Sequence, residues 1–284
     1  MGKIVCTNCP HTCTLTAASR GRCSVRENRN DALFLPYYGM ITASNIDPIE
    51  KKPLAHFRPG SYIPSFGFTG CNLQCPFCQN WQISQNQNSA GELTTPQKLI
   101  RCVSVMGFPQ VAYTYSEPLV HPEFLLACMH EAEQNDIANV LVTNGCAAQE
   151  TADAVLRKTQ AANIDLKCFS REKYRDVLGG DLDAVLMFIE RAYALNVHIE
   201  VTTLVVTDFN DALEELMQCA QFIAGISPAI PWHITAYHPA WKYHKKATSG
   251  TLLKTVAERA RDFLTNVHIG NVVTEKGETH HDDA

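Results

Sequence analysis

Apolar runs rich in β-branched and aromatic residues recur along most of the chain and predict strands. These runs span residues 62–69, 110–115, 138–143, 162–167, 197–206, 231–237 and 267–273. Between them, apolar residues repeat at helical spacing. One such set is Leu182, Val185, Leu186, Ile189 and Tyr193, and another is Leu252, Val256, Ala260, Phe263 and Leu264. Strands that are apolar on both faces and alternate with helices predict an α/β fold with a parallel sheet, curved into a partial barrel.

This pattern does not extend to the ends of the chain. Residues 1–30 hold clustered cysteines among small and polar residues, and residues 31–61 are rich in prolines and polar residues, as expected of an extended connector. We therefore predict a cysteine-rich metal-binding segment at 1–30, a connector at 31–61 and a barrel domain at 62–273. The polar tail at 274–284 is predicted to be disordered.

A compact cysteine motif follows the first predicted strand of the barrel. It reads Cys71-Asn-Leu-Gln-Cys75-Pro-Phe-Cys78. Three thiolates at this spacing can bind one metal centre, and the lack of a nearby fourth thiolate leaves a coordination position open. A structural zinc site normally has a closed set of four ligands, whereas iron–sulfur clusters are held by cysteine thiolates. The motif therefore favours an iron–sulfur cluster over zinc.

The first segment holds a second cysteine group, Cys6, Cys9, Cys13 and Cys23. Without a periodic apolar pattern of its own, this segment is expected to need a bound metal in order to fold. Four thiolates fit a structural zinc ion, which we prefer at this point, and they equally fit an auxiliary iron–sulfur cluster. His11 is a fifth candidate ligand, although we interpret it as a surface residue.

Net charge and cysteine content exclude some classes of protein. The chain has 284 residues, is 45% hydrophobic and carries a formal net charge of −5. This charge gives no broad attraction to nucleic acid or to an anionic membrane. Seven of the 12 cysteines lie in the two groups above, which indicates reduced thiols and metal rather than disulfides. The chain begins without an apolar signal core, so we expect a cytoplasmic protein with no membrane partner.

Polar side chains stand at the ends of several predicted strands, where barrel enzymes place their chemistry. Ser116 and Glu117 follow the second strand, and Asn144 follows the third. Asp165 and Lys167 close the fourth strand, where ionised side chains need partners. Glu117 could instead be a favourable charge at the start of a helix, and Asp165 and Lys167 could be a plain buried ion pair.

The sixth strand carries two histidines. His238 ends the strand and is a candidate ligand residue, although a lone histidine is more often a satisfied polar residue. His233 stands at the start of the strand, where the barrel is expected to have a structural role. The fifth strand holds Glu200, Thr202 and Thr203 in an apolar run, which predicts polar groups inside the barrel.

The motif Gly67-Phe-Thr-Gly-Cys71-Asn-Leu-Gln-Cys75-Pro-Phe-Cys78-Gln-Asn-Trp81, together with Cys6-Thr-Asn-Cys9-Pro-His-Thr-Cys13, resembles the radical S-adenosylmethionine (SAM) component of the AmmeMemoRadiSam system. That family is related to the pyruvate formate-lyase activating enzymes. The resemblance runs from about Cys6 to Val272 and implies a partial (β/α)6-type barrel. It implies that Cys71, Cys75 and Cys78 hold three irons of a 4Fe-4S cluster, with Phe77 beside them, while SAM chelates the fourth iron.

The resemblance also suggests roles for the strand-end residues. It implies that Ser116, Glu117 and Asn144 belong to the SAM pocket, with Glu117 meeting the SAM amino group. Lys167 and His238 would meet the SAM carboxylate, and Asp165 would help to organise the pocket.

The chain departs from the family pattern in two places. It lacks a C-terminal Cys-Pro-x-Cys element, which favours a self-contained site at Cys6, Cys9, Cys13 and Cys23. Residues 242–249 are basic where the family often has a proline-rich loop.

The cysteine motifs and the family resemblance together leave three candidate functions. The first is a radical SAM enzyme, whose 5′-deoxyadenosyl radical abstracts hydrogen from a substrate that is a small molecule, an RNA or a protein. The second is an activase that creates a glycyl radical on a partner protein. The third is an iron–sulfur or zinc module that transfers electrons without SAM chemistry. For either enzyme, an electron donor such as a flavodoxin or ferredoxin is expected.

Overall fold

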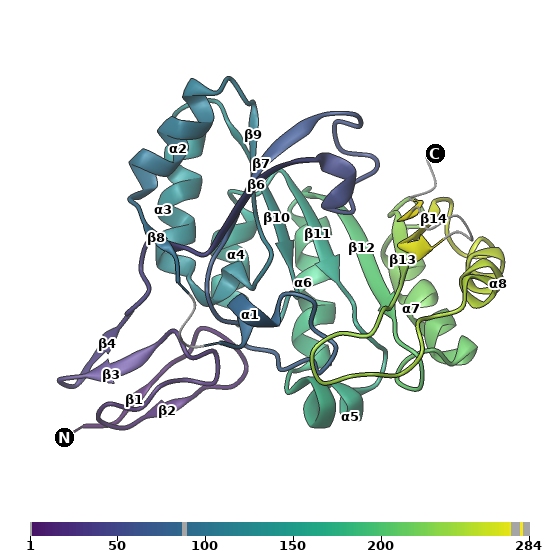
Figure 1. The fold of residues 1–284 in the computed structure, drawn as a ribbon, viewed down its shortest axis with the longest axis horizontal. Helices are drawn as coiled ribbons and strands as arrows, with labels where there is room; N and C mark the ends of the chain where they lie inside the picture. Colours follow the sequence, from purple (N-terminus) through teal and green to yellow (C-terminus); the bar gives the residue numbers. More distant parts are fainter. Residues whose placement is uncertain (1, 87–89, 274–278, 281–284) are drawn as a thin grey trace.

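The centre of the molecule is an open sheet of eight strands in the order β14-β13-β12-β11-β10-β9-β7-β6 (Figure 1). The structure is a computed structural model that describes residues 2–86, 90–273 and 279–280. The sheet strands are β6 (Ala43–Pro48), β7 (Tyr62–Gly67), β9 (Gln110–Thr114), β10 (Ala138–Thr143), β11 (Ala161–Asp165), β12 (His198–Val205), β13 (Trp232–Ala236) and β14 (Val267–Gly270). Neighbours from β7 to β14 are parallel, and β6 is an antiparallel edge strand.

The predicted strands all appear, with boundaries that differ by a few residues at most sites. The run at 138–143 coincides with β10. The run at 267–273 is divided, because Asn271 has a positive φ of 59° and ends the parallel pairing after Gly270. The chain continues as β15 (Val272–Val273), which pairs with β16 (Thr279–His280). The rest of the predicted tail at 274–284 lies outside the described residues.

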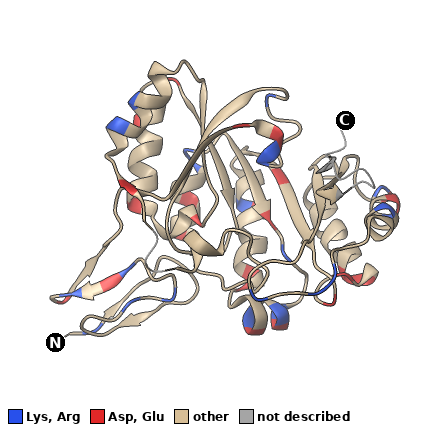
Figure 2. Ribbon diagram, viewed as in Figure 1, with Lys and Arg blue, Asp and Glu red and all other residues tan. Residues whose placement is uncertain are grey.

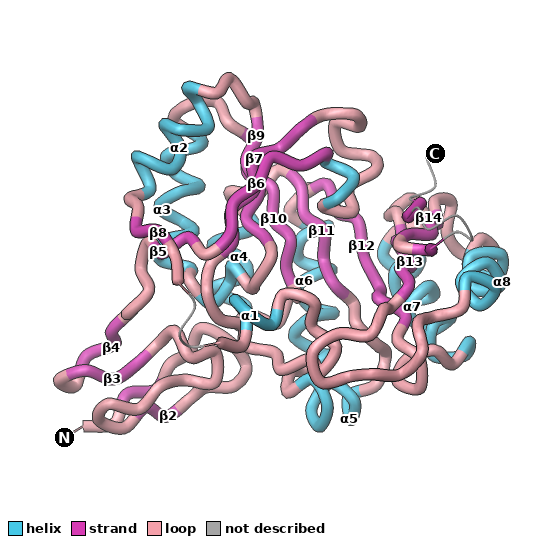
Figure 3. Tube along the Cα trace, viewed as in Figure 1, coloured by secondary structure: helices cyan, strands magenta, loops and turns pink. Residues whose placement is uncertain are grey.

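Helices follow the strands and cover the sheet (Figure 3). The longer ones are α2 (Pro96–Val105), α3 (Pro122–Glu133), α4 (Gln149–Leu156), α6 (Leu182–Ala194), α7 (Leu213–Ile226) and α8 (Gly250–Ala260). The short ones are α1 (Trp81–Ser84), α5 (Arg171–Lys173), η1 (Ile49–Lys51), η2 (Pro118–Val120) and η3 (Tyr174–Leu178). This alternation confirms the α/β fold with a parallel sheet.

The two predicted helical faces are largely buried, with exceptions near the helix ends. Leu182 and Val185 of α6 face the core, but Tyr193 in its last turn is 45% exposed. Helix α8 ends at Ala260, so Phe263 lies beyond it and is 36% exposed. The apolar residues therefore continue at helical spacing in the sequence beyond the part of each helix that is buried.

The region predicted to be an extended connector contributes regular structure. It contains β4 (Ala32–Phe34), β5 (Met40–Ile41) and the edge strand β6, and β5 pairs with β8 (Glu92–Leu93). Strand β6 bonds to the sheet on one side, and most of its side chains are not buried. Its sequence therefore lacks the apolar run by which buried strands are recognised. At its end, Asp47 forms a buried ion pair with Lys52 at 2.7 Å.

The first thirty residues form short strands beside α1 (Figure 1). These are β1 (Ile4–Val5), β2 (Thr14–Leu15) and β3 (Glu27–Arg29). The segment is fixed to the barrel by polar contacts. Arg26 forms two hydrogen bonds with Glu123 of α3, at 2.6 and 2.9 Å, and Asn8 Nδ2 donates to the Leu119 carbonyl at 2.8 Å. Its position places the N-terminal cysteines near the carboxyl ends of the sheet strands.

Glu200 of β12 closes the opposite end of the sheet. Its fully buried carboxylate accepts hydrogen bonds from the backbone N–H groups of Ala55 and His56 and from the rings of His198 and His233. Burial alone would raise the pKa of Glu200, but the bonds from the two histidines hold it well below its ordinary value. Glu200 thus joins β12 to the segment before β7 and to β13, and His233 lies at this end of the sheet, away from the thiols.

Acidic and basic positions are interspersed along the ribbon, with both signs in most parts of the fold (Figure 2). This agrees with the small net charge of −5. Among the described residues, no helix is long and apolar enough to cross a membrane.

Candidate metal centre and cofactor cavity

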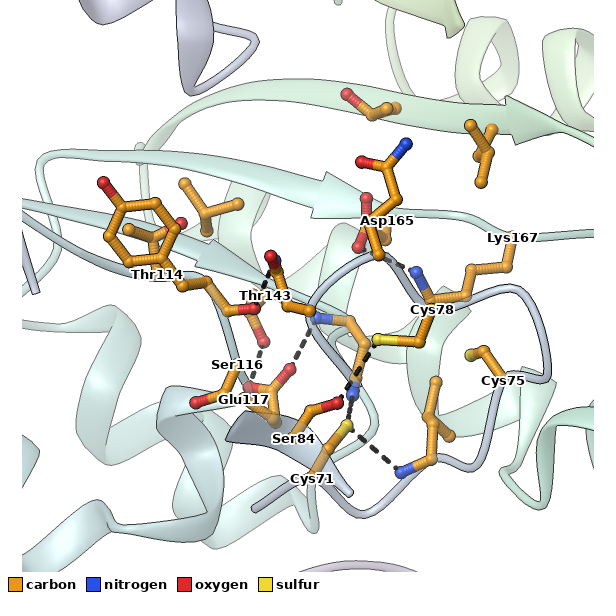
Figure 4. Close-up of a pocket in the computed structure, with 18 of the residues that line it drawn as sticks. Cys71, Cys75, Cys78, Ser84, Thr114, Ser116, Glu117, Thr143, Asp165 and Lys167 are labelled. Carbon is orange, nitrogen blue, oxygen red and sulfur yellow. Dashed lines mark hydrogen bonds and ion pairs between the residues drawn. The ribbon is translucent and has the colours of Figure 1, made fainter. Parts of the chain in front are cut away.

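The loop between β7 and α1 presents the three cysteines of the central motif (Figure 4). Cys75 is buried, and Cys71 and Cys78 are partly exposed. The loop supports the sulfurs with local donors. The Leu73 N–H lies 3.4 Å from Cys71 Sγ, and the Ser84 hydroxyl lies 3.2 Å from Cys78 Sγ. The Cys78 N–H closes a turn on the Cys75 carbonyl at 3.2 Å.

The arrangement of the thiols bears on what they can hold. In the described part of the chain, no three His, Cys, Asp or Glu side chains converge tightly enough to ligate one metal ion. A cluster is different, because each thiolate binds its own iron and the sulfurs need not meet at one point. All described cysteines are free thiols. This donor set fits a cluster with one iron left unligated by protein.

A cavity of about 320 Å³ opens beside the thiols. It lies at the carboxyl ends of the parallel strands, where α/β folds bind their ligands. Ten of the residues singled out in the sequence line it: Cys71, Cys75, Phe77, Cys78, Ser116, Glu117, Asn144, Asp165, Lys167 and Thr202. The fold therefore brings together residues that are up to 131 positions apart in the chain, from Cys71 to Thr202.

Glu117 is fixed at the base of this cavity and is 1% exposed. Its Oε1 accepts hydrogen bonds from the Leu119 N–H at 3.0 Å and the Thr143 hydroxyl at 2.6 Å, and its Oε2 accepts from the Asn144 N–H at 2.8 Å. Burial raises its pKa to about 7, although these bonds oppose the shift. Glu117 thus caps η2, as the alternative interpretation proposed, and also lines the cavity.

Lys167 and Asp165 form an ion pair at the wall of the cavity, with Nζ and Oδ2 2.9 Å apart. The Lys167 side chain is 18% exposed. Burial would lower the pKa of Lys167, but Asp165 and the neighbouring thiols of Cys75 and Cys78 raise it well above its ordinary value. A cation therefore lies close to two of the three thiols of the central motif. Burial raises the pKa of Cys75 to about 12, and Lys167 opposes that rise.

Two further predicted residues, Ser116 and Phe77, also line the cavity. The Ser116 hydroxyl is buried and has no hydrogen-bond partner among the described residues. A buried hydroxyl without a partner is costly, so this atom fits a ligand that supplies one. Phe77 packs beneath the cluster loop, with its ring 5.2 Å from that of Phe209 and 6.0 Å from that of Tyr243.

His238 is the predicted pocket residue that the structure keeps apart. It is not among the residues that line the cavity. Its Nε2 lies 2.9 Å from the Asn271 carbonyl oxygen. Its contact with a ligand carboxylate remains a prediction.

Sequence reasoning missed three residues that organise the site. Thr143 binds Glu117, Ser84 contacts Cys78, and Asn72 joins the cluster loop to β10. Asn72 Nδ2 donates to the Cys146 carbonyl at 2.6 Å, and Asn72 Oδ1 accepts from Asn144 Nδ2 at 3.0 Å. The sequence offered a signal for Asn72, because it lies inside the cysteine motif directly after Cys71. No local sequence feature distinguishes Ser84.

The N-terminal cysteines lie near the same loop. Cys6, Cys9 and Cys23 are each 8% exposed, and Cys13 is partly exposed. His11, which was interpreted as a surface residue, is half-buried, and its Nε2 lies 2.9 Å from the Asn72 carbonyl oxygen. The structure thus uses His11 to fix the segment against the cluster loop.

Comparison with known proteins gives a consistent result. A family model described as "Radical SAM superfamily" matches residues 66–222. The "Uncharacterized protein MJ0808" of Methanocaldococcus jannaschii is 35% identical over 285 residues, which cover 97% of this chain and 84% of that protein. The 4-hydroxyphenylacetate decarboxylase activating enzyme of Clostridium scatologenes is 29% identical over 115 residues, which cover 40% of this chain and 37% of that enzyme.

Solved structures show the same fold. A domain of a pyruvate-formate lyase-activating enzyme from Bacteroides vulgatus has a TM-score of 0.50 and 23% identity, covering 56% of this chain and 98% of that one. Streptococcus suis SuiB bound to S-adenosylmethionine has a TM-score of 0.58 and 14% identity, covering 72% of this chain and 49% of that one. This chain spans about half of SuiB and less than half of the activating enzyme from Clostridium scatologenes.

Proposed function

This protein belongs to the radical SAM superfamily of enzymes, and from that premise we propose that Cys71, Cys75 and Cys78 hold the 4Fe-4S cluster at which SAM is reductively cleaved. The observation that carries the proposal is the shared cavity. Three free thiols, an unpartnered Ser116 hydroxyl and the charged groups of Glu117, Asp165 and Lys167 all line it. When bound, the reduced cluster supplies an electron to the SAM sulfonium, which yields the 5′-deoxyadenosyl radical that abstracts hydrogen from substrate.

The residues of this chain bind and orient SAM. Among the described residues, the Oε2 of Glu117 accepts one hydrogen bond, from the Asn144 N–H, and so keeps acceptor capacity for the SAM ammonium. Lys167 offers a cation for the SAM carboxylate, and Asp165 holds its ammonium in place at 2.9 Å. The Ser116 hydroxyl would gain the partner that it lacks in the protein. His238 is proposed as a further carboxylate contact on the strength of the family resemblance.

Lys167 also acts on the cluster ligands. Its charge lies close to the thiols of Cys75 and Cys78, and it lowers the pKa of Cys75, which favours the thiolate form that binds iron. Asn144 Nδ2 lies 3.5 Å from Cys71 Sγ. Hydrogen bonds to cluster sulfurs tune the reduction potential of the cluster.

Within the superfamily we place the chain in the radical SAM component of the AmmeMemoRadiSam system, supported by its two cysteine motifs. A flavodoxin or ferredoxin is the proposed electron donor. A glycyl-radical activase is the second candidate function, supported by relatives that are named activating enzymes. Relatives named GTP 3′,8-cyclases match at similar identity, so the relatives do not select one substrate class.

The test is reductive SAM cleavage in anaerobically reconstituted protein, with dithionite and no added substrate. We expect slow formation of 5′-deoxyadenosine in the parent. Glu117→Ala, Lys167→Ala and His238→Ala should each bind SAM about tenfold to a hundredfold more weakly, because each loses a charge-assisted contact. Iron content should be unchanged, since the cysteines are intact.

Lys173→Ala is the matched control, because Lys173 pairs with Glu215 and does not line the cavity. No 5′-deoxyadenosine from fully loaded parent protein would overturn the proposed function. Unchanged SAM affinity in the three variants would keep the reaction and reject the assigned pocket.

A further inference from the structure

The N-terminal cysteines form a second group of thiols that the proposed reaction does not use. A turn brings them together, because the Cys6 N–H bonds to the Cys13 carbonyl at 2.9 Å and the Thr12 N–H to the Cys9 carbonyl at 3.1 Å. Cys23 arrives from a separate turn and packs on Val25. Cys6, Cys9 and Cys23 are nearly buried as free thiols, and Cys13 is partly exposed. The segment therefore gathers four metal ligands with one edge open to solvent.

One nitrogen of a buried cation beside this group has no hydrogen-bond partner among the described residues. Arg26 is 5% exposed, and its two terminal nitrogens bond to Glu123. Its Nε is buried and has no acceptor among the described residues. The sulfur of Cys6 lies close to this guanidinium group. A metal-bound thiolate at Cys6 would provide the anionic acceptor that a neutral thiol does not.

The arrangement of the thiols distinguishes a cluster from a single ion. As at Cys71, Cys75 and Cys78, no three of these side chains converge on one point within the described residues. The group is nevertheless compact, because the Cys6 N–H bonds to the Cys13 carbonyl and Cys6, Cys9 and Cys23 are all buried. A tetrahedral zinc site needs tight convergence, whereas a cluster separates its thiolates on different irons. Four thiolates would also ligate every iron, leaving no position for SAM.

The group is connected to the central cluster loop by amide side chains. The side chain of Asn72 lies close to the sulfur of Cys9. Asn144 Nδ2 donates to Asn72 Oδ1 at 3.0 Å and lies 3.5 Å from Cys71 Sγ. The backbone is equally close, because a Cβ on Gly70 would lie 2.6 Å from the Cys23 carbonyl oxygen. Sulfurs of the two cysteine groups are therefore bridged by two side chains.

We infer that Cys6, Cys9, Cys13 and Cys23 hold a second, fully ligated iron–sulfur cluster that relays electrons to the cluster at Cys71, Cys75 and Cys78. A flavodoxin- or ferredoxin-type protein gives one electron to the second cluster near partly exposed Cys13 and is itself oxidised. The second cluster then passes this electron through the Asn72 contact to the first cluster and returns to its oxidised state. The relay rests on the proposed function, whereas the metal site does not.

The metal site is tested in the full chain with Cys71→Ala, Cys75→Ala and Cys78→Ala combined. After anaerobic reconstitution, this variant should retain about four iron and four sulfide ions per chain. Adding Cys13→Ala should remove them, whereas adding Cys102→Ala, at an exposed cysteine outside both groups, should not. Zinc without sulfide, or no metal in the combined variant, would overturn the second cluster. These counts come from the combined variant itself and decide the case even if Cys13→Ala does not fold.

The relay is tested by changing the reductant. Asn72→Ala keeps all seven cysteine ligands, so both clusters should load. Dithionite is small enough to reach the first cluster directly, so its reaction measures any damage that the substitution does to the site. The rate of 5′-deoxyadenosine formation with reduced flavodoxin, divided by the rate with dithionite, should therefore fall in this variant.

Equal loss with both reductants, or no loss with flavodoxin, would overturn the relay. Absence of cleavage in the parent with dithionite would instead reject the proposed function, and the iron and sulfide counts would then decide the second cluster alone.

Discussion

At the scale of single residues, Glu117 shows how one side chain serves both structure and chemistry. It caps η2 through the Leu119 N–H and joins the ends of two strands through Thr143 and Asn144. Such a residue cannot move freely toward a ligand, and it presents a carboxylate whose position is already fixed. This preorganisation reduces the ordering that binding requires.

The raised pKa of Glu117 makes SAM binding depend on pH. Because burial raises this pKa to about 7, the carboxyl group is protonated below pH 7 and then offers no charge to an ammonium group. We expect SAM affinity to fall by up to about tenfold per pH unit below that value. Titration calorimetry between pH 6 and pH 8 measures the effect. In Glu117→Gln the affinity should be weaker and flat with pH, and a slope equal to that of the parent would assign the effect to another group.

At the scale of elements, the loop before Cys71 depends on a glycine. Gly70 has a φ of +85°, and a Cβ there would lie 2.5 Å from the Val25 side chain and 2.6 Å from the Cys23 carbonyl. The turn that delivers the cluster cysteines and the turn that delivers Cys23 therefore pack directly against each other. A side chain at this position would separate the two metal-binding segments.

Gly70→Ala should thus destabilise the protein more than a matched substitution elsewhere. Gly60→Ala is the control, because Gly60 also has a positive φ, of +75°, but has nothing within 4 Å of its Cβ position. Both variants should lose about 1 kcal/mol from backbone strain. Gly70→Ala should lose roughly a further 1–3 kcal/mol from the clash. Urea unfolding measures both, and equal losses would show that the contact with Cys23 is not tight.

At the scale of the whole molecule, the two ends of the sheet are specialised. The carboxyl ends of the strands carry the cavity and the proposed metal ligands, whereas the amino ends are closed by Glu200 and its histidines. The N-terminal segment is attached at the chemical end through Arg26, Asn8 and His11. One end of the sheet is therefore assigned to stability, through buried Glu200, and the other to the proposed function, through the residues of the cavity.

His121 should make the stability of the whole protein depend on pH. It precedes α3, is 4% exposed, and its Nε2 donates to the Thr69 carbonyl oxygen at 2.7 Å. Burial lowers its pKa from 6.5 to about 4, so between these values the unfolded chain binds a proton that the folded chain does not. Stability should therefore fall as the pH drops from 6.5 toward 4, by about 3 kcal/mol at most.

The free energy of unfolding in urea at pH 5 and pH 7 measures this change. Glu117 acts in the opposite direction, because its raised pKa makes the folded state prefer the proton up to about pH 7. Comparison with His121→Gln, which keeps a donor but does not titrate, separates the two groups. The variant should lose stability less steeply than the parent below pH 6.5, and an equal slope would contradict the role of His121.

The sequence by itself determined features that are local in the chain. The strand at 138–143 could be located because its residues are apolar on both faces, and the cluster loop because Cys71, Cys75 and Cys78 lie within eight residues of each other. That Glu117 and Lys167 would lie together in one cavity could also be predicted from the sequence. A parallel sheet gathers its strand ends at one edge, so residues that end strands were expected to meet.

Tertiary structure decided what depends on contacts between distant segments. Strand β6 could not be recognised, because an edge strand with exposed polar residues has no apolar pattern. His238 ends a strand yet lies against Asn271, since the direction of a side chain depends on its neighbours as well as its position. The bridge from Cys9 through Asn72 to Asn144 and Cys71 joins three segments, and it exists because the fold packs the N-terminal turn onto the cluster loop.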